Sequence, residues 1–258
     1  MPEGLEAEIW CRSAQSLIGR EIGPVWCDER VAPVGLADEL VGAVIRSVRR
    51  RGKVLLVGTE GPVLGLHFGM TGRLVVDGRS PIERLQYASG ADRKEWDRLR
   101  LETVPMMRQG PALRMNDPRR LGRISLDRDL SRLGPDLFTV TASELASAFK
   151  RRRIAVKTAL LDQHVVAGLG NLCADEVLFW SGVAPTRSVD SLRELELEAI
   201  SAACRERLQI MLVAGGSTCG ELSPNVRAEA GSCPLDGGNL RRASINGRTA
   251  VWCERHQQ

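Results

Sequence analysis

The first residues of the chain carry groups that could form and break covalent bonds. Pro2 precedes Glu3 and Glu6, which open a segment, residues 3–18, with apolar side chains at helical spacing. Proline normally permits removal of the initiator methionine, which would make Pro2 the amino terminus. Because an α-amine has a pKa of about 8 and a lysine one of about 10.4, far more of the α-amine is an uncharged nucleophile at neutral pH.

These residues predict an amine nucleophile at Pro2, with Glu3 and Glu6 as carboxylates that donate or accept protons. The dipeptide alone is also typical of a processed N-terminus followed by a helix with an acidic first turn. This is the commoner role of Pro-Glu at the start of a chain.

Four side chains near the C-terminus have the types and spacing of metal ligands, in two pairs at the ends of a predicted β-hairpin. Strand-like residues 240–245 and 248–252 flank Asn246-Gly247, a dipeptide that strongly favours a two-residue turn. Because a hairpin brings its ends together, the four side chains should meet: Cys233, Asp236, Cys253 and His256.

The chemistry of this set favours one structural Zn²⁺. Cysteine and histidine are common zinc ligands, whereas aspartate is less common in structural sites, so Asp236 is the candidate fourth ligand. A metal-free hairpin held by packing of Ile245, Val251 and Trp252 is the alternative.

A glycine-containing turn in the middle of the chain predicts an anion site. Residues 167–171, Ala-Gly-Leu-Gly-Asn, join two segments with helical spacing. The first N–H groups of a helix lack partners within the helix and carry the positive end of its dipole, so a phosphate could bind there. Asn171 adds a side-chain amide donor. An ordinary helical hairpin with a glycine reversal has the same pattern.

Composition indicates a globular protein of two modest domains. The chain has 258 residues, of which 43% are hydrophobic and 26% charged, and a net charge of +4. We expect a cytoplasmic protein, because its N-terminus lacks the layout of a signal peptide, no apolar run reaches membrane-spanning length, and seven cysteines form no evident disulfide framework.

The elements that must position these groups predict an α+β fold. After the N-terminal helix, short aliphatic or alternating runs predict an antiparallel β-sandwich with strands at 44–48, 53–57, 63–68, 73–76, 98–101 and 123–126. The second half predicts helices at about 142–151, 155–166, 171–181 and 190–213, the first started by a capping box at Thr141 and Glu144.

The predicted domain organisation has four parts. They are an N-terminal β-sandwich domain at 1–127, which carries Pro2 and Glu6, a linker at 128–139, a helical domain at 140–216 with the predicted anion site, and a zinc-ribbon-like hairpin at 231–258.

Several motifs together resemble the formamidopyrimidine-DNA glycosylase / endonuclease VIII family. Residues 161–185 closely resemble the family's helix–two-turn–helix motif. The other matching motifs follow in the family's order: Pro2-Glu3, Arg51-Gly52-Lys53, His67-Phe68-Gly69-Met70, Asp117-Pro118-Arg119-Arg120 and the C-terminal hairpin. The resemblance covers nearly the full chain. In the family the C-terminal metal ligands are four cysteines, so Asp236 and His256 depart from the pattern.

The resemblance implies roles for further residues. Lys53, Asn171 and Arg248 would bind phosphates at the lesion, with Lys53 part of the catalytic group. Met70, Arg119 and Leu121 would fill the gap left when a base is swung out of the duplex. Family members commonly have an aromatic residue where this chain has Leu121. Core packing of Met70 and Leu121 is the alternative.

The resemblance therefore implies a monomeric, bifunctional DNA glycosylase and AP lyase. Pro2 would attack a damaged nucleoside and cut the strand by β,δ-elimination, with double-stranded DNA containing damaged bases or abasic sites as its partner. Pro2-Glu3-Gly4 is more similar to the endonuclease VIII branch, which favours oxidised pyrimidines, and the stretch 217–230 is short for the lesion-capping loop of the formamidopyrimidine branch. Both similarities imply oxidised pyrimidines, or abasic sites alone, as substrates. A protein of the same fold that binds damaged DNA without cutting it is the alternative.

Overall fold

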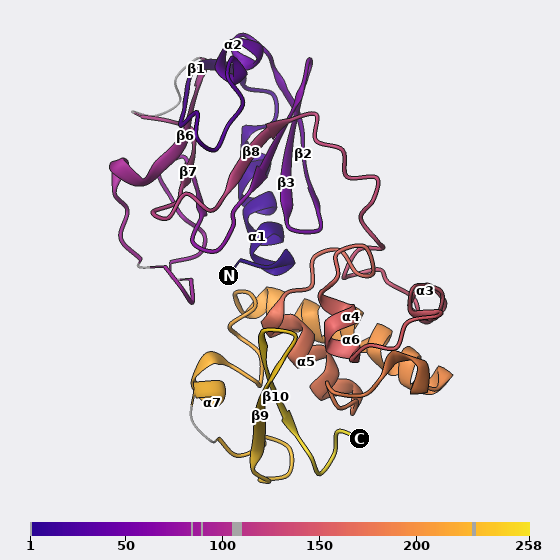
Figure 1. Cartoon of the computed structure of the whole chain (residues 1–258). Helices are drawn as coiled ribbons and strands as arrows, with labels where there is room; N and C mark the ends of the chain where they lie inside the picture. The colour runs from indigo at the N-terminus through magenta and orange to yellow at the C-terminus, as the bar shows by residue number, and fades with distance from the viewer. Residues whose placement is uncertain (1, 84, 89, 105–109, 229–230) are drawn as a thin grey trace. The chain divides into compact units, whose positions relative to one another are not determined.

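The computed structural model describes residues 2–258 except 84, 89, 105–109 and 229–230. It contains two compact units, drawn in Figure 1. Unit 1 contains Pro2 and Glu6–Ser131, and unit 2 contains Glu3–Leu5 and Arg132–Gln258. The α+β fold class expected from the sequence is confirmed. The four-part division stays a prediction.

Unit 1 contains two four-stranded antiparallel sheets and the helices α1 (Gly4–Ala14) and α2 (Leu36–Leu40). One sheet has the order β1-β6-β7-β5 and the other β2-β3-β4-β8. The strands are β1 (Glu21–Cys27), β2 (Ile45–Arg51), β3 (Val54–Thr59), β4 (Val63–His67), β5 (Arg73–Val76), β6 (Asp97–Val104), β7 (Leu113–Asn116) and β8 (Arg123–Leu126).

One hydrophobic cluster contains residues of both sheets and of α1, so the sheets pack face to face around a shared core. Leu55 of β3 and Leu99 of β6 are fully buried in it. Trp10 of α1 packs on Phe68, with ring centroids 4.0 Å apart. This packing fixes the start of the turn that carries Met70.

Two strands of unit 1 escape prediction from the sequence. β1 contains Gly23 and Pro24, which normally interrupt strands, and its pairing with β6 shifts register between Ile22 and Val25. β7 alternates apolar and polar residues, Leu-Arg-Met-Asn, but over only four positions, which is too short a run to stand out.

Unit 2 is helical and ends in a β-hairpin (Figure 1). Its helices are α3 (Ala142–Phe149), α4 (Val156–Leu161), α5 (Asn171–Ser181), α6 (Glu194–Ala214) and α7 (Pro224–Ala228), and its strands are β9 (Leu240–Ile245) and β10 (Arg248–Cys253). The capping box at Thr141 and Glu144 is present. Among the described residues, no helix is long and apolar enough to span a membrane.

The predicted helix 155–166 is too long. α4 ends at Leu161, and the next residues form a turn in which the amides of Val165 and Val166 donate to the carbonyl of Asp162. The apolar residues Val165 and Val166 are buried, so they continue the helical pattern without continuing the helix. The segment 162–170 is thus the double turn between α4 and α5.

The C-terminal hairpin forms as the sequence predicts. Asn246 and Gly247 have φ angles of 48° and 72°, the left-handed conformations that a type I′ turn requires at both central positions. β9 and β10 pair in register, with Arg248 opposite Ile245. Arg248 is therefore the first residue after the turn.

A buried cluster of charges fixes this hairpin to the helices of unit 2. Lys157 and Arg227 both place a nitrogen 2.6 Å from a carboxylate oxygen of Asp175 in α5. Both cations also donate to the carbonyl of Thr249 in β10, at 2.6 Å and 3.2 Å. Burial lowers the pKa of Lys157 and raises that of Asp175, while their mutual attraction opposes both shifts.

Replacing Asp175 should therefore destabilise unit 2. Asp175→Asn leaves two buried cations without a counter-charge, so we expect a loss of about 3–5 kcal/mol in the free energy of unfolding, measured by urea denaturation. Glu254→Gln removes the carboxylate of an exposed pair with Arg241 in the same hairpin and should cost below about 1 kcal/mol. Equal losses in the two variants would contradict this account.

Candidate functional site

The start of α5 binds an anion, and that anion is a carboxylate of the chain itself. The amides of Gly170, Leu172 and Cys173 donate to the two carboxylate oxygens of Glu3 at 2.9–3.0 Å. Glu3 is 1% exposed. The prediction that these N–H groups remain bare for a DNA phosphate is therefore wrong, because Glu3 takes the place that an external anion would occupy.

The two glycines before α5 are required because side chains from elsewhere in the chain pack directly against their backbone. A Cβ on Gly170 would lie 2.2 Å from Cδ of Glu3, so any side chain there would displace the carboxylate. Gly168 has a φ of 108°, and a Cβ on it would lie 2.0 Å from a methyl carbon of Leu137. The carbonyl of Gly168 also accepts a hydrogen bond from the amide of Gly4 at 2.9 Å.

Gln163 organises the double turn and was not singled out from the sequence. Its side-chain oxygen accepts from the amide of Gly168, and its side-chain nitrogen donates to the carbonyls of Leu161 and Leu169. A glutamine between two helical segments gives no distinctive signal, so only the structure identifies this role.

The predicted DNA-binding residues of unit 2 lie at the ends of elements. Asn171 is the first residue of α5, and its side-chain Oδ1 is buried without a hydrogen-bond partner among the described residues. Arg248 is exposed beside the hairpin turn and forms no ion pair within the described part of the chain. Its neighbour Thr249 is anchored by the buried Asp175 cluster, so the backbone that carries Arg248 is held firmly.

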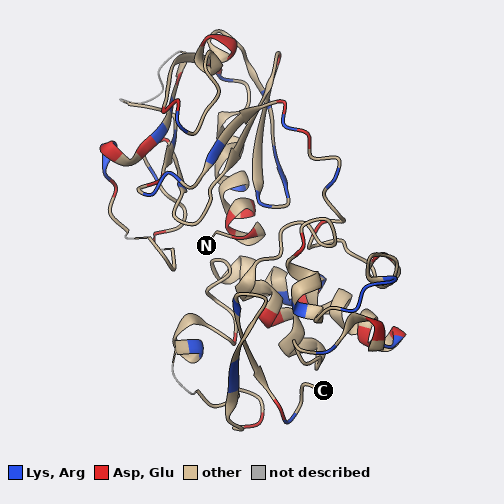
Figure 2. Ribbon diagram, in the orientation of Figure 1, with Lys and Arg blue, Asp and Glu red and all other residues tan. Residues whose placement is uncertain are grey.

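The predicted catalytic residues Pro2, Glu6 and Lys53 are less exposed to solvent than Arg248. Pro2 and Glu6 are buried, whereas Met1 lies outside the described residues. Lys53 is half-buried at the β2–β3 hairpin, where Figure 2 shows Lys and Arg in blue. Burial lowers the pKa of nearby His67 to about 4, and the charges of Arg128, Lys53 and other cations add to this effect. The surroundings of His67 are thus electropositive.

The predicted gap-filling residues lie on two turns of unit 1 that touch. A Cβ on Gly69 would lie 2.4 Å from the carbonyl of Leu121, so the turn before Met70 packs directly on the turn that carries Leu121. Leu121 is 40% exposed and Arg119 is also exposed, while Met70 is half-buried. Core packing therefore does not explain Leu121.

Asp117 holds these two turns together. Its Oδ2 accepts hydrogen bonds from the amides of Leu121 and Gly122 at 2.7 and 2.8 Å. Its Oδ1 accepts from the amide of Arg119 at 3.2 Å and from the hydroxyl of Thr71 at 2.5 Å. The carboxylate is fully buried, so the position of the turn depends on it.

The four predicted metal ligands converge at the base of the C-terminal hairpin. Their ligand atoms all lie within 4.8 Å of one another. Sγ of Cys233 is 3.7 Å from Nδ1 of His256, Sγ of Cys253 is 3.3 Å from Oδ2 of Asp236, and that oxygen is 3.5 Å from Nδ1 of His256. Tetrahedral Zn²⁺ with bonds of about 2.0–2.3 Å would separate its ligand atoms by about 3.3–3.8 Å, so this set fits the ion.

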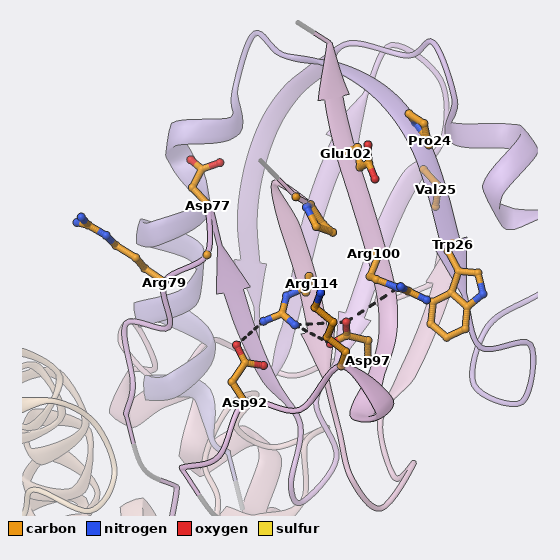
Figure 3. A pocket seen from close by; sticks show the side chains of 14 residues that line it. Pro24, Val25, Trp26, Asp77, Arg79, Asp92, Asp97, Arg100, Glu102 and Arg114 are labelled. Atoms are coloured by element: carbon orange, nitrogen blue, oxygen red, sulfur yellow. Dashed lines mark hydrogen bonds and ion pairs between the residues drawn. The ribbon is translucent and has the colours of Figure 1, made fainter. Parts of the chain in front are cut away.

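A cleft of about 840 Å³ on the β1-β6-β7-β5 sheet contains none of the predicted site residues (Figure 3). Two of its guanidinium groups have partners within the cleft. Arg100 lies over the ring of Trp26 at 4.2 Å, and Arg114 contacts Asp92 and Asp97. Since none of the residues singled out from the sequence lines this cleft, it is not a candidate for the functional site.

The sequence matches two models of one protein family. The formamidopyrimidine-DNA glycosylase N-terminal domain matches residues 1–124, and the formamidopyrimidine-DNA glycosylase H2TH domain matches residues 133–222. The chain is 34% identical over 251 residues to the formamidopyrimidine-DNA glycosylase of Paracoccus denitrificans, covering 88% of this chain and 87% of the relative. It is 31% identical to that of Pelobacter propionicus over the whole of both chains.

Solved structures give the same result. The MutM (Fpg) protein of Thermus thermophilus is 28% identical, with a TM-score of 0.78 and coverage of 99% of this chain and 98% of that one. Lactococcus lactis Fpg in complex with DNA containing an abasic site has a TM-score of 0.80 over 99% of both chains, at 23% identity, and is similar in fold. The chain therefore belongs to the formamidopyrimidine-DNA glycosylase / endonuclease VIII family.

Proposed function

We propose that this protein is a base-excision-repair DNA glycosylase with AP-lyase activity on oxidised bases and abasic sites in double-stranded DNA. The observation that carries the proposal is the carboxylate of Glu3, buried against the start of α5 and bonded in sequence to Pro2. Relatives named formamidopyrimidine-DNA glycosylase, and Fpg structures with Fapy-dG or abasic-site DNA, support the substrate class.

Pro2 is the proposed nucleophile, after removal of Met1. Its secondary amine attacks C1′ of the damaged nucleoside, and the C1′–N bond breaks as the base leaves with the bonding electrons and a proton. Opening of the sugar ring gives an iminium ion between the Pro2 nitrogen and C1′, which accepts electrons from the sugar. Loss of a C2′ proton then expels the 3′ phosphate, and a second elimination expels the 5′ phosphate.

Glu3 and Glu6 are the proposed proton carriers. The proton lost by the attacking amine must reach the sugar or the leaving base, and a carboxylate beside Pro2 in sequence can carry it. The carboxylate oxygens of Glu3 already accept backbone N–H bonds, so their orientation is fixed before DNA binds. Glu6 assists as a second carboxylate on α1.

Lys53, Asn171 and Arg248 are the proposed phosphate-binding residues. The exposed guanidinium of Arg248 can bind one phosphate bidentately. The side-chain NH2 of Asn171, at the first position of α5, can donate to a phosphate oxygen. Met70, Arg119 and Leu121 fill the space left by the extruded base. The exposure of Arg119 and Leu121 supports this role.

We propose oxidised pyrimidines as the preferred lesions within this class. Pro2-Glu3-Gly4 and the short stretch 217–230 support this choice. The relatives' name refers instead to formamidopyrimidines, so a lesion panel must include an oxidised purine.

Zn²⁺ is the proposed structural metal, held by Cys233, Asp236, Cys253 and His256. A bound Zn²⁺ would stabilise the base of the hairpin that carries Arg248. The separations between ligand atoms and the burial of both cysteines support this proposal.

Borohydride trapping tests the proposed chemistry. Wild-type protein, with loss of Met1 verified by intact mass, should form a covalent adduct with oligonucleotides that carry an abasic site, thymine glycol or 8-oxoguanine. Pro2→Gly should reduce trapping on every substrate. Glu3→Gln should reduce it most on intact lesions, because an abasic site has already lost its base. Tight binding of the same DNA without any wild-type adduct would identify a non-catalytic damage-binding protein instead.

Replacing Arg248 should weaken binding to damaged DNA and its dependence on salt. Loss of one phosphate contact should lower the slope of log affinity against log salt by about 1 in Arg248→Ala, measured by fluorescence anisotropy at several salt concentrations. Arg241→Ala is the control, since Arg241 lies on the same hairpin and pairs with Glu254. A slope that stays unchanged in Arg248→Ala would reject the phosphate role.

Metal analysis tests the zinc proposal. Protein purified without a histidine tag should contain about one Zn²⁺ per chain, and a chelator should lower its thermal unfolding temperature. Cys253→Ala should abolish the bound metal, whereas Asp236→Asn should lower affinity for it if Asp236 is the fourth ligand. Negligible zinc, together with a thermal unfolding temperature that the chelator does not change, would favour the metal-free hairpin.

A further inference from the structure

Arg120 has a backbone conformation that an ordinary L-residue rarely adopts. Its φ angle is 52°, in the left-handed region where the Cβ crowds the following carbonyl. It lies between Arg119 and Leu121, whose side chains are exposed. Something must therefore hold this turn in shape.

The side chain of Arg120 forms an ion pair that can do so. Its Nε donates to Oδ2 of Asp28 at 2.8 Å, and Asp28, which directly follows β1, is only 7% exposed. Arg98 donates to the same oxygen at 3.1 Å and, through its Nε, to the carbonyl of Asp117 at 2.9 Å. Asp28 is thus linked to the turn both directly and through Arg98.

Asp28 is charged in this environment. Burial alone would raise the pKa of its carboxyl, but hydrogen bonds from Arg120 and Arg30 outweigh burial and hold that pKa well below its usual range. The carboxylate therefore presents a permanent negative charge to Arg120 at any pH near neutrality.

The direction of the Arg120 side chain is informative. Arg98 is buried and needs a counter-charge for stability, whereas the side chain of Arg120 is 40% exposed and could be solvated without a partner. It is instead paired with Asp28, whereas its neighbour Arg119, which is also exposed, has no ion pair among the described residues. Its pairing therefore matters for the shape of the turn more than for the stability of the core.

We infer that Asp28 and Arg120 are positioning residues whose ion pair holds the left-handed turn that presents Arg119 and Leu121 to the space left by an extruded nucleotide. This inference rests on the proposed function. It assigns part of the recognition of double-stranded DNA, including sensitivity to the opposite base, to a pair that acts by holding the turn.

Strand cleavage at an abasic site tests this inference, because the same chemistry can be measured with and without a duplex. One abasic-site oligonucleotide is used as a single strand and in duplexes with A, C, G or T opposite the site. Asp28→Asn and Arg120→Ala should lower kcat/KM on the duplexes about tenfold and reduce the differences between opposite bases. Cleavage of the single strand, which has no gap to fill, should not change.

Two further variants separate the turn from general stability. Arg30→Ala removes an exposed cation that contacts the same carboxylate without belonging to the turn, so its duplex activity should match wild type. Arg120→Gly should lose less than Arg120→Ala, because glycine accepts positive φ without steric cost. If Asp28→Asn fails to fold, the Arg120→Ala variant, whose substitution is at an exposed side chain, tests the inference alone.

The outcomes distinguish this inference from the proposed function. Equal losses on single strand and duplex, or an unchanged duplex rate in Arg120→Ala, would overturn the positioning role while leaving the AP-lyase activity established. An Arg30→Ala defect as large as that of Arg120→Ala would also overturn it. A wild-type protein that cleaves neither form would refute the proposed function and, with it, this inference.

Discussion

The site depends first on the carboxylate of Glu3 at the start of α5. Three backbone donors and the positive end of a helix hold one buried anion, an arrangement that is favourable only when no side chain intervenes. This explains the glycine at position 170, where a Cβ would meet Glu3 at 2.2 Å. The residue bonded to Glu3 is Pro2, so the anion site at the start of α5 fixes the residue next to the proposed nucleophile. A helix start that looks ready for a phosphate serves instead to hold the carboxylate of Glu3, a proposed proton carrier.

The same arrangement recurs at two other places in the chain. In each, a buried carboxylate fixes the backbone beside an exposed residue for which we propose a contact with DNA. Asp117 holds the turn that carries Leu121, and Asp175 fixes the carbonyl of Thr249 through two cations, directly beside Arg248. Buried charges are costly unless paired, so each network has few alternative arrangements. Exposed side chains are thereby carried by backbone segments that buried hydrogen bonds hold in place.

Local signals in the sequence predicted local structure well. The Asn246-Gly247 turn, the Thr141 capping box and the meeting of the four metal-ligand side chains all follow from short-range chemistry. Features that depend on contacts distant in sequence could not be predicted in this way. The pairing of Asp28 with Arg120, the docking of Glu3 on α5, and the strand β1 with its internal proline are all set by distant partners. The sequence predicts too long a helix before the double turn, because buried apolar residues in a turn can have the same spacing as those in a helix.

Locating the covalent bond tests the central claim most directly. After borohydride reduction on an abasic-site oligonucleotide, nuclease and trypsin digestion would leave the sugar remnant on one peptide for tandem mass spectrometry. The account predicts that residues 2–12 carry the remnant, on the nitrogen of Pro2. A remnant on residues 52–73, with cleavage blocked at Lys53, would contradict the account and make Lys53 the nucleophile.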